Sequence, residues 1–441
     1  MFARIKRVIG DAGLLTLLFS LMVFSVALAA SGDLDTTFSG DGKVTTNFGP
    51  LPGRSDKVFG MAIQPDGKIV AAGESSSSLS NSDFAVTRYN SNGSRDTTFS
   101  GDGRLITNFG GGDRAYDIAI QSDGKIIASG ERISNTSMIP HVALARYNTN
   151  GALDTTFSGD GKVLTNYGGK GSGSEGGLAI LSDGRIVVAG YVWNGTNTDF
   201  AVYSYNPNGS LDTTFSANGD GVSISEFGSG RQDLAGDLAI QSDGKIVVVG
   251  FSGDANGNNN NFAILRLHKN GTGDFTFSGD ARQTTNFGAD EYAYGLALGP
   301  NGKIVVVGEK RTSTTSYFAI ARYNENGTID TTFNGTGKKV LSIIPGEWSL
   351  ANDVIVQPNG KIVVVGFTRN GSGTYDFAVL RLNGNGSFDT TFSGDGRVIV
   401  DFGGLDFGFA LVRQPSEGKY VLGGYTRDGT QDDFGLARLL P

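Results

Sequence analysis

The sequence contains no cysteine and only two histidines among its 441 residues. The missing cysteines exclude disulfides, and they also exclude a lipid-modified cysteine at the start of a processed chain. Two histidines are too few for a zinc or iron site built from several imidazoles. Both of them, His141 and His268, fall in expected strands at repeated positions, whereas a Ser–His–Asp triad needs a histidine at the mouth of a site. The composition therefore argues against these kinds of enzyme.

Clustered basic residues are also missing beyond the extreme N-terminus, and the formal charge is −8. Nucleic acid needs clustered Lys and Arg for its phosphates, so we expect no nucleic-acid partner. Apolar residues are scarce at 38%, whereas glycine is abundant with 68 copies. This balance favours many short strands joined by tight turns over long helices.

Residues 1–29 have the pattern of a secretory signal peptide. A basic start with Arg4, Lys6 and Arg7 precedes an apolar core from Leu14 to Val26, and the sequence Ala27-Leu28-Ala29 follows as a small-x-small cleavage pattern. An uncleaved membrane anchor is the alternative, although the apolar core is short for a span. We expect an exported protein, secreted or periplasmic, with no membrane span after cleavage near Ala30.

A motif that begins as LDTTFSGDGKVTTNFG at residues 34–49 recurs along the chain at a period of roughly 60 residues. Two further motifs, AIQPDGKIVAAG and DFAVTRYNSNG, recur in the same phase, and each of the three occurs seven times. Every unit then contains four expected strands, two of them joined by a tight Asp-Gly or Asn-Gly turn. The aspartates of the first motif are Asp35, Asp96, Asp154, Asp212, Asp274, Asp330 and Asp389.

Seven four-stranded units predict an all-β fold, a seven-bladed β-propeller of antiparallel blades. A β-solenoid with long rungs is the alternative. The processed chain starts with a fourth strand and ends with a third strand, so its two incomplete units complement each other. If residues 44–48 join the blade made from residues 409–439, the N-terminal outer strand closes the ring. We therefore expect residues 30–441 to form a single monomeric propeller domain.

The repeated units LDTTFSGDGKV, AIQPDGKIV and FAVTRYN resemble the delta-60 repeat family, a group of secreted bacterial β-propellers. The resemblance covers nearly all of residues 34–439. It implies a propeller fold and export from a bacterial cell. It implies no established activity.

The repeated aspartates have a structural interpretation, because an Asp followed by two threonines can bond its own backbone two residues later and fix a turn. We expect the phenylalanine of the same motif, Phe38 and its copies, to pack between blades. The aspartates of the SGDG element suggest the alternative of bound Ca²⁺. Their spacing matches no EF-hand loop, and no other cofactor is expected; these aspartates are Asp41, Asp102, Asp160 and Asp395.

The connections between second and third strands differ in every unit, whereas the other turns are short and nearly constant. One face of the propeller therefore offers varied chemistry on a rigid scaffold. Its aromatic and basic side chains are candidates for stacking on a ligand or clamping it. These candidates are Tyr191, Trp193, Arg132, Arg311, Arg369 and Arg427.

Five residues before the first apolar position of the first strand, five of the seven units carry a carboxylate. In a closed ring these side chains would form an acidic collar at the tunnel mouth, either solvated or binding a cation or a polyhydroxylated ligand. Nearer to the apolar position, Asp117, Asp237 and Asp353 alternate with glycines, an alternation for which the sequence suggests no mechanism. The collar candidates are Asp56, Asp113, Asp233, Glu291 and Asp406.

These patterns favour an exported, non-catalytic binding scaffold whose variable face holds a cell-surface glycan or an envelope protein. The alternative is a polysaccharide hydrolase or lyase in which Asp113, Asp233 and Glu291 face one another across the tunnel. A purely structural envelope module is a third hypothesis.

Overall fold

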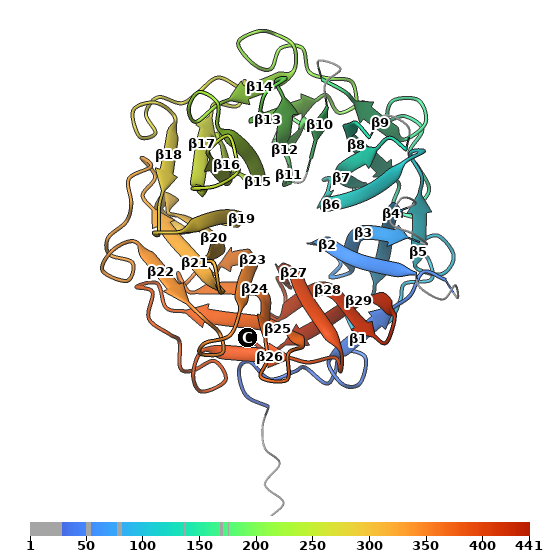
Figure 1. The fold of residues 1–441 in the computed structure, drawn as a ribbon. Coiled ribbons are helices and arrows are strands. Elements are labelled where there is room, and N and C mark those ends of the chain that lie inside the picture. The colour runs from blue at the N-terminus through green and yellow to red at the C-terminus, as the bar shows by residue number, and fades with distance from the viewer. Residues whose placement is uncertain (1–28, 50–53, 77–81, 136–137, 168–170, 175) are drawn as a thin grey trace, which may run out of the picture.

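The computed structural model describes residues 29–49, 54–76, 82–135, 138–167, 171–174 and 176–441. Except for Ala29, the expected signal peptide lies outside the described residues. The described chain forms a ring of β-sheets around a central opening (Figure 1). This is the predicted all-β, seven-bladed propeller.

Each blade is an antiparallel sheet whose first strand is innermost. Blade 1 is β2 (Ser55–Ile63), β3 (Ile69–Ser76), β4 (Ser82–Tyr89) and β5 (Arg104–Thr107). Blade 2 is β6 (Gly112–Ile120), β7 (Ile126–Ile133), β8 (Pro140–Tyr147) and β9 (Lys162–Thr165). Blade 3 is β10 (Ser172–Gly173), β11 (Leu178–Ile180), β12 (Ile186–Trp193), β13 (Thr198–Tyr205) and β14 (Val222–Ser225), so that its first strand is in two pieces.

The remaining blades follow the same order. Blade 4 is β15 (Gln232–Ile240), β16 (Ile246–Gly253), β17 (Asn261–Leu267) and β18 (Arg282–Thr285). Blade 5 is β19 (Asp290–Leu298), the 3₁₀ turn η1 (Pro300–Gly302), β20 (Ile304–Arg311), β21 (Ser316–Tyr323) and β22 (Lys338–Leu341). Blade 6 is β23 (Ser349–Val356), β24 (Ile362–Arg369), β25 (Tyr375–Leu382) and β26 (Arg397–Val400). Blade 7 is β27 (Leu405–Arg413), β28 (Tyr420–Asp428), β29 (Gln431–Leu439) and, from the other end of the chain, β1 (Lys43–Thr46).

The two ends of the chain meet in blade 7, as predicted. β1 pairs antiparallel with β29 in a register that places Val44 opposite Leu436 and Thr46 opposite Phe434. A single parallel bridge between Ser55 and Asp432 also joins blade 7 to blade 1. The N-terminal strand therefore completes the last blade.

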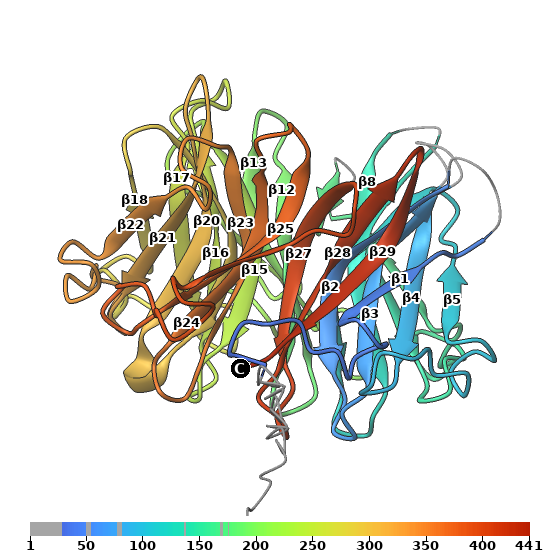
Figure 2. The ribbon, with the colours of Figure 1, turned by 90° about the horizontal axis from the view of Figure 1, so that it is seen from below.

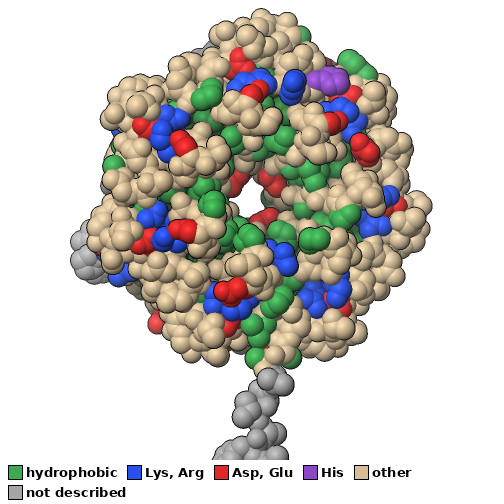
Figure 3. All heavy atoms as spheres, turned by 180° about the vertical axis from the view of Figure 1, so that it is seen from behind, with side chains coloured by type: hydrophobic (Ala, Val, Ile, Leu, Met, Phe, Trp, Pro, Cys, Tyr) green, Lys and Arg blue, Asp and Glu red, His purple; other side chains and the backbone are tan. Residues whose placement is uncertain are grey.

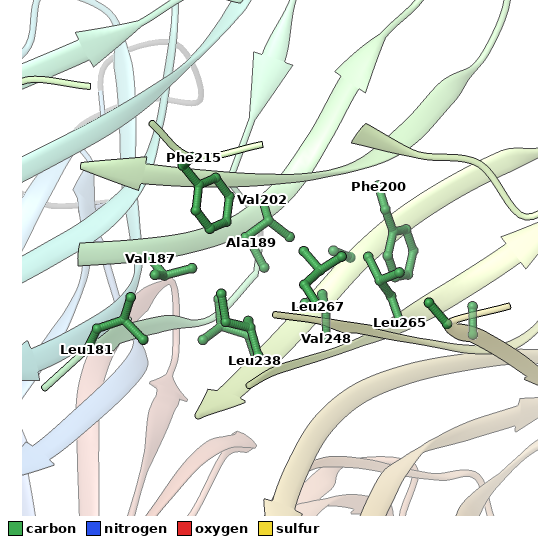
Figure 4. Close-up of a cluster of buried hydrophobic side chains, with 14 residues drawn as sticks. Leu181, Val187, Ala189, Phe200, Val202, Phe215, Leu238, Val248, Leu265 and Leu267 are labelled. Atoms are coloured by element: carbon green, nitrogen blue, oxygen red, sulfur yellow. The ribbon is translucent and has the colours of Figure 1, made fainter. Parts of the chain in front are cut away.

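The hydrophobic core lies between neighbouring blades rather than at the centre of the ring. In the cluster of Figure 4, Val187 and Phe200 of blade 3 face Val248 and Leu265 of blade 4. Phe215, from the LDTTF motif between the third and fourth strands of blade 3, belongs to the same cluster and is fully buried. Its copies are equally buried, which confirms that these phenylalanines pack between blades; they are Phe38, Phe99, Phe157, Phe277, Phe333 and Phe392.

The side view separates two faces of the ring (Figure 2). The loops between second and third strands project on the upper face, and the short turns, including η1, lie on the lower face. On the lower face, basic and acidic side chains gather together at intervals around the ring (Figure 3). The loops that vary in sequence are therefore concentrated on the upper face, as predicted.

Candidate functional site

The predicted collar residues do not line the tunnel mouth. Asp56, Asp113, Asp233, Glu291 and Asp406 are all fully buried, and none contacts the central cavity. In each case a carboxylate oxygen accepts a hydrogen bond from a backbone N–H of the loop that enters the strand, for example Phe109 to Asp113 at 2.6 Å and Phe402 to Asp406 at 2.6 Å. The expected acidic collar is therefore wrong, because side chains alternate along the strand and these turn into the junctions between blades.

Burial changes the acidity of these junction carboxyls. It raises the pKa of Asp113 to about 6, and it also raises the pKa of the other four. A buried carboxylate without a cationic partner favours its neutral form, and the backbone donors offset this only in part. The glycosidase arrangement predicted from Asp113, Asp233 and Glu291 across the tunnel is not present.

The predicted loop residues are spread over five blades. Trp193 is 36% exposed at the end of β12, and Tyr191 of the same strand packs over Gly173, where a Cβ would lie 2.6 Å from its ring. Arg311 binds Glu309 and lies 4.8 Å from the centre of the Tyr292 ring. Arg427 pairs with Asp432, Arg132 donates to the Gly110 carbonyl, and Arg369 is exposed. The structure does not assemble these residues into one site.

The central tunnel contains a cavity of about 520 Å³. Its lining departs from the symmetry of the repeat. Among the described residues, blades 3 and 4 contribute three glycines, Gly176, Gly177 and Gly236, and one aspartate, Asp237. The other blades contribute aromatic rings: Phe59, Tyr116, Tyr294, Phe367, Phe407, Phe409 and Tyr425.

The rings of blades 6 and 7 form a continuous aromatic wall. Tyr425 stacks with two rings of β27. The ring centroids lie 4.9 Å apart for Phe407 and Tyr425, and 5.7 Å apart for Phe409 and Tyr425. Phe407 also stacks with Tyr375, at 5.1 Å. Tyr375 in turn meets Trp348 edge to face at 5.8 Å.

This wall rises from the tunnel to the variable face. Trp348 directly precedes β23 and Tyr375 begins β25, and both of these strands start at the variable face. We use the name aromatic wall for Trp348, Phe367, Tyr375, Phe407, Phe409 and Tyr425. Most of its rings are partly exposed, so they offer apolar faces to a ligand.

Three aspartates complete the tunnel lining: Asp117, Asp237 and Asp353. Each follows a bulge in the first strand of its blade, where the register shifts by one residue. In the space-filling view, acidic side chains are visible inside the central hole (Figure 3). Among the described residues, the carboxylates of the tunnel are therefore these three and not the predicted collar.

The same residues explain the alternation of Asp and Gly in the sequence. The Oδ1 atom of Asp117 accepts a hydrogen bond from the N–H of Ile118, and its Oδ2 atom accepts one from Leu178 of the next blade at 2.7 Å. On its other side stands Gly60, where a Cβ would lie only 2.7 Å from the Asp117 Cα. Asp237 and Asp353 make the same bonds, to Leu296 and Leu411. Each Asp therefore fastens its blade to the next, and each Gly leaves room for the Asp of the following blade.

The tunnel carboxyls have raised pKa values because they lie deep in the ring, where each residue is only partly exposed. Burial raises the pKa of Asp117 to about 6 and that of Asp353 to about 7. Burial and then the charges of Asp117 and Asp353 raise the pKa of Asp237 well above its ordinary value. Near neutral pH the tunnel can thus both donate and accept hydrogen bonds.

Sequence reasoning missed the aromatic lining of the tunnel, including the aromatic wall. The signal lay one residue before the alternating Asp and Gly, where Phe59, Tyr116 and Tyr294 stand in the register of Gly176 and Gly236. Such a departure from a repeat marks a position that the architecture does not constrain. Trp348 lies in a connection that carries no repeated motif, and only the fold brings it to Tyr375.

Two kinds of acidic group bear on metal binding. In the SGDG turns, each Asp accepts a hydrogen bond from the backbone two residues on, as Asp41 does from Lys43 at 2.9 Å. One cluster of the described residues, Asp376, Asp401 and Asp406, offers carboxylate oxygens that all lie within 4.8 Å of one another.

In the part of the chain that the structure describes, no helix is both long and apolar enough to span a membrane.

Several solved structures have a similar overall shape. A protein of unknown function from Dyadobacter fermentans is 12% identical over 88% of this chain and 100% of its own, with a TM-score of 0.46. The polysaccharide lyase Uly1 is 11% identical over 87% of this chain and 89% of its own, with a TM-score of 0.48. An α-L-arabinanase from Penicillium chrysogenum is 11% identical over 73% of this chain and 91% of its own, with a TM-score of 0.45. Similarity at this level carries no argument about function.

No curated protein has significant sequence similarity to this chain. A family model described as the β-propeller domain of unknown function DUF5122 matches it seven times, once in each repeat. The matched residues are 64–99, 121–157, 181–215, 241–277, 299–333, 357–392 and 416–441, together more than half of the chain. The chain therefore belongs to the DUF5122 family of β-propeller repeat proteins.

Proposed function

We propose that this protein is an exported binding protein that holds a glycan segment against the aromatic wall and in the tunnel below it. The observation that carries the proposal is the lopsided lining of the tunnel. A repeat that only built a ring would repeat its inner surface, yet here one side is aromatic and the other is glycine.

The chemistry of the lining suits a sugar. Partly exposed rings such as Phe407 and Tyr425 supply flat apolar faces, and a few fixed polar groups beside them set orientation. Asp353 and Asn352 are such groups, since both line the same cavity. Opposite the wall, the described lining of blades 3 and 4 consists of three glycines and Asp237, which leaves room for the ligand.

Binding at this site agrees with the predicted signal peptide, because glycans of the cell surface are reached after export. The variable face would then admit the ligand, and its loops would tune which chain is accepted. The protein would need no catalytic group for this role.

Titration against neutral, uronic-acid and amino-sugar oligosaccharides, followed by calorimetry, tests the proposal. We expect one class to bind, and Phe407→Ala to weaken its binding about tenfold, as expected for the loss of roughly 1.4 kcal/mol of ring contact. Trp193→Ala is the control, because Trp193 lies on blade 3 and outside the wall. Equal weakening by both variants, or binding that neither affects, would overturn the assignment to the wall.

A second candidate is a polysaccharide hydrolase or lyase that uses the tunnel carboxyls. The observation in its favour is the pKa of Asp353, raised to about 7, since a general acid works best near the ambient pH. The same oligosaccharides, analysed for shortened products, distinguish the two functions. Turnover that disappears in Asp353→Asn would support the enzyme, and binding without products would support the scaffold.

A further inference from the structure

The junction between blades 6 and 7 brings together three aspartates from three separate elements. Asp376 is the second residue of β25, Asp401 directly follows β26, and Asp406 is the second residue of β27. Each contributes a carboxylate oxygen to the cluster in which all three oxygens lie within 4.8 Å of one another. Two of these side chains are held on strands, so the cluster is part of the framework of the ring.

The negative charge of the cluster is not balanced by a paired cationic side chain among the described residues. Asp406 is fully buried and Asp376 is 4% exposed, whereas Asp401 is exposed. No salt bridge in the described part of the chain involves any of the three. Lys43 donates to the main-chain carbonyl of Asp401, so it contacts the backbone there.

One buried oxygen has no partner at all. The Oδ2 atom of Asp376 accepts a hydrogen bond from Asn370 at 2.9 Å, but its Oδ1 atom is buried without any hydrogen bond. Such an orphaned carboxylate oxygen is costly unless something positive fills the place beside it. The oxygens of Asp406 already accept bonds from Phe402 and Thr426, which orient that carboxylate.

The other junctions show what is special here. The corresponding three positions in the junction of blades 7 and 1 are Asp433, Asn47 and Asp56, and there the Asn47 amide donates to Asp433 at 2.9 Å. Between blades 3 and 4 the three positions are Asp199, Glu226 and Asp233, and Asp199 receives two amide hydrogen bonds, from Asn194 and Asn197. At the junction of blades 6 and 7, Asp401 takes the place of Asn47, and the three carboxylates approach within 4.8 Å of one another.

We propose that Asp376, Asp401 and Asp406 bind a divalent cation, Ca²⁺, between blades 6 and 7. All the ligand atoms are oxygens, which hard cations prefer, and three carboxylates supply the charge. Their spacing lies within the span of two Ca–O bonds, about 4.8 Å, and Mg²⁺ would require a closer approach of side chains held on strands. The exposed side of Asp401 admits the water molecules that would complete the coordination shell.

A cation at this place would join the two blades that carry the aromatic wall. Asp376 follows Tyr375 and Asp406 precedes Phe407, and these two rings stack on each other. Metal binding would hold the strands that present them. The metal site itself does not depend on the proposed glycan function, because it can be measured with Ca²⁺ alone.

The test is a thermal melt of the chelated protein across a Ca²⁺ titration, together with equilibrium dialysis against Ca²⁺. We expect a saturable rise in Tm and one bound ion per chain. Asp401→Asn should weaken binding at least tenfold and should fold normally, since Asp401 is exposed. Asp395→Asn, in an exposed SGDG turn, is the matched control and should behave as the parent.

Three results would overturn the proposal. One is the absence of bound Ca²⁺, with a Tm that rises only on acidification, as expected for carboxyls that share a proton. Another is Ca²⁺ binding that Asp401→Asn leaves unchanged, which would move the site elsewhere. The third is an equal response to Mg²⁺, which would contradict the choice of ion. Asp376→Asn is a second variant, and its loss of binding should match that of Asp401→Asn.

Discussion

At the scale of single residues, the most informative feature is an aspartate that both joins two blades by hydrogen bonds and lines the tunnel. Asp353 bonds the N–H of Val354 in its own blade and that of Leu411 in the next, and it faces the tunnel. Because seven is odd, a strict alternation of Asp and Gly cannot close around the ring. Ala410 stands at the seventh position, so the blade 7 strand carries neither Asp nor Gly there.

The raised pKa of Asp353 predicts a dependence of stability on pH. Its pKa is about 7 in the folded protein and 3.8 ordinarily, so the folded state binds the proton more tightly. The stability that this group contributes is fully present below pH of about 4 and is lost as the pH rises through about 7. The Tm difference between the parent and Asp353→Asn should therefore shrink from pH 4 to pH 8.

Differential scanning fluorimetry across that range measures the effect. Asp395→Asn, in an exposed turn, should show a constant difference from the parent. A constant difference for Asp353→Asn would show that its carboxyl does not carry the raised pKa.

At the scale of the repeated element, the LDTTF motif works as a clamp between blades. The Oδ1 atom of Asp154 accepts bonds from the Thr156 backbone and hydroxyl, as the sequence predicted. Its Oδ2 atom binds Arg146 at 2.8 Å, and Arg146 lies 4.6 Å from the centre of the Phe157 ring. Arg146 also donates to the carbonyl of Pro207, which belongs to the following repeat.

In blade 3 a different arginine pairs with the aspartate of the motif. This blade has Ser204 where the other blades have the arginine, and there Arg185 of the first-to-second turn reaches Asp212 at 3.0 Å instead. The other blades have a lysine in that turn, and Lys125 pairs with Asp154 at 3.1 Å. Burial alone would raise the pKa of Asp154, but the bonds from Thr156 and Lys125 outweigh it and lower the pKa to about 2.

Removing the buried arginine should therefore be costly. We expect Arg146→Ala to reduce the free energy of unfolding by on the order of 3 kcal/mol, since it breaks a buried ion pair and leaves the Pro207 carbonyl without its donor. Urea denaturation measures this change. Lys68→Ala is the control, because among the described residues Lys68 pairs only with the exposed Asp66, so its loss should cost less than about 1 kcal/mol. Equal costs would mean that the clamp contributes no more than a surface pair.

At the scale of the whole molecule, the two chain ends are neighbours that complete one blade. The N–H of Gly32 donates to the carbonyl of Leu440 at 3.1 Å, and the N–H of Leu440 donates to that of Asp33 at 2.9 Å. Together with the pairing of β1 and β29, these bonds satisfy an edge that would otherwise be open. Closure of the ring therefore depends on which strands lie side by side, and not on their order in the sequence.

A circular permutant should fold for this reason. We expect a chain that joins Pro441 to Ala30 by a short Gly-Ser linker, and opens at the exposed residues 255–259 between β16 and β17, to keep the parent circular dichroism spectrum and nearly the parent Tm. Deletion of residues 30–49 is the comparison, and it should lower the Tm and promote aggregation, because it exposes the edge of β29. A permutant that does not fold would show that the order of strands along the chain matters for closure.

Taken alone, the sequence determined the number of blades and the four-stranded structure of each. The spacing of the Asp-Gly turns, the apolar strand runs and the complementary incomplete units at the two ends predict seven four-stranded blades and the pairing of β1 with β29, because these are local patterns repeated at one period. The buried LDTTF phenylalanines and the turn bonds of their aspartates follow from the same local chemistry.

Only the tertiary structure decided which side chains face the tunnel. The strand pleat turns Asp113 into a junction, while the bulge after Ala115 shifts the register and places Asp117 in the lining. A period count along the sequence does not reveal a one-residue bulge. Two further contacts join residues that lie far apart in the sequence: Trp348 with Tyr375, and Asp376 with Asp401. These residues meet because the ring packs separate strands against one another.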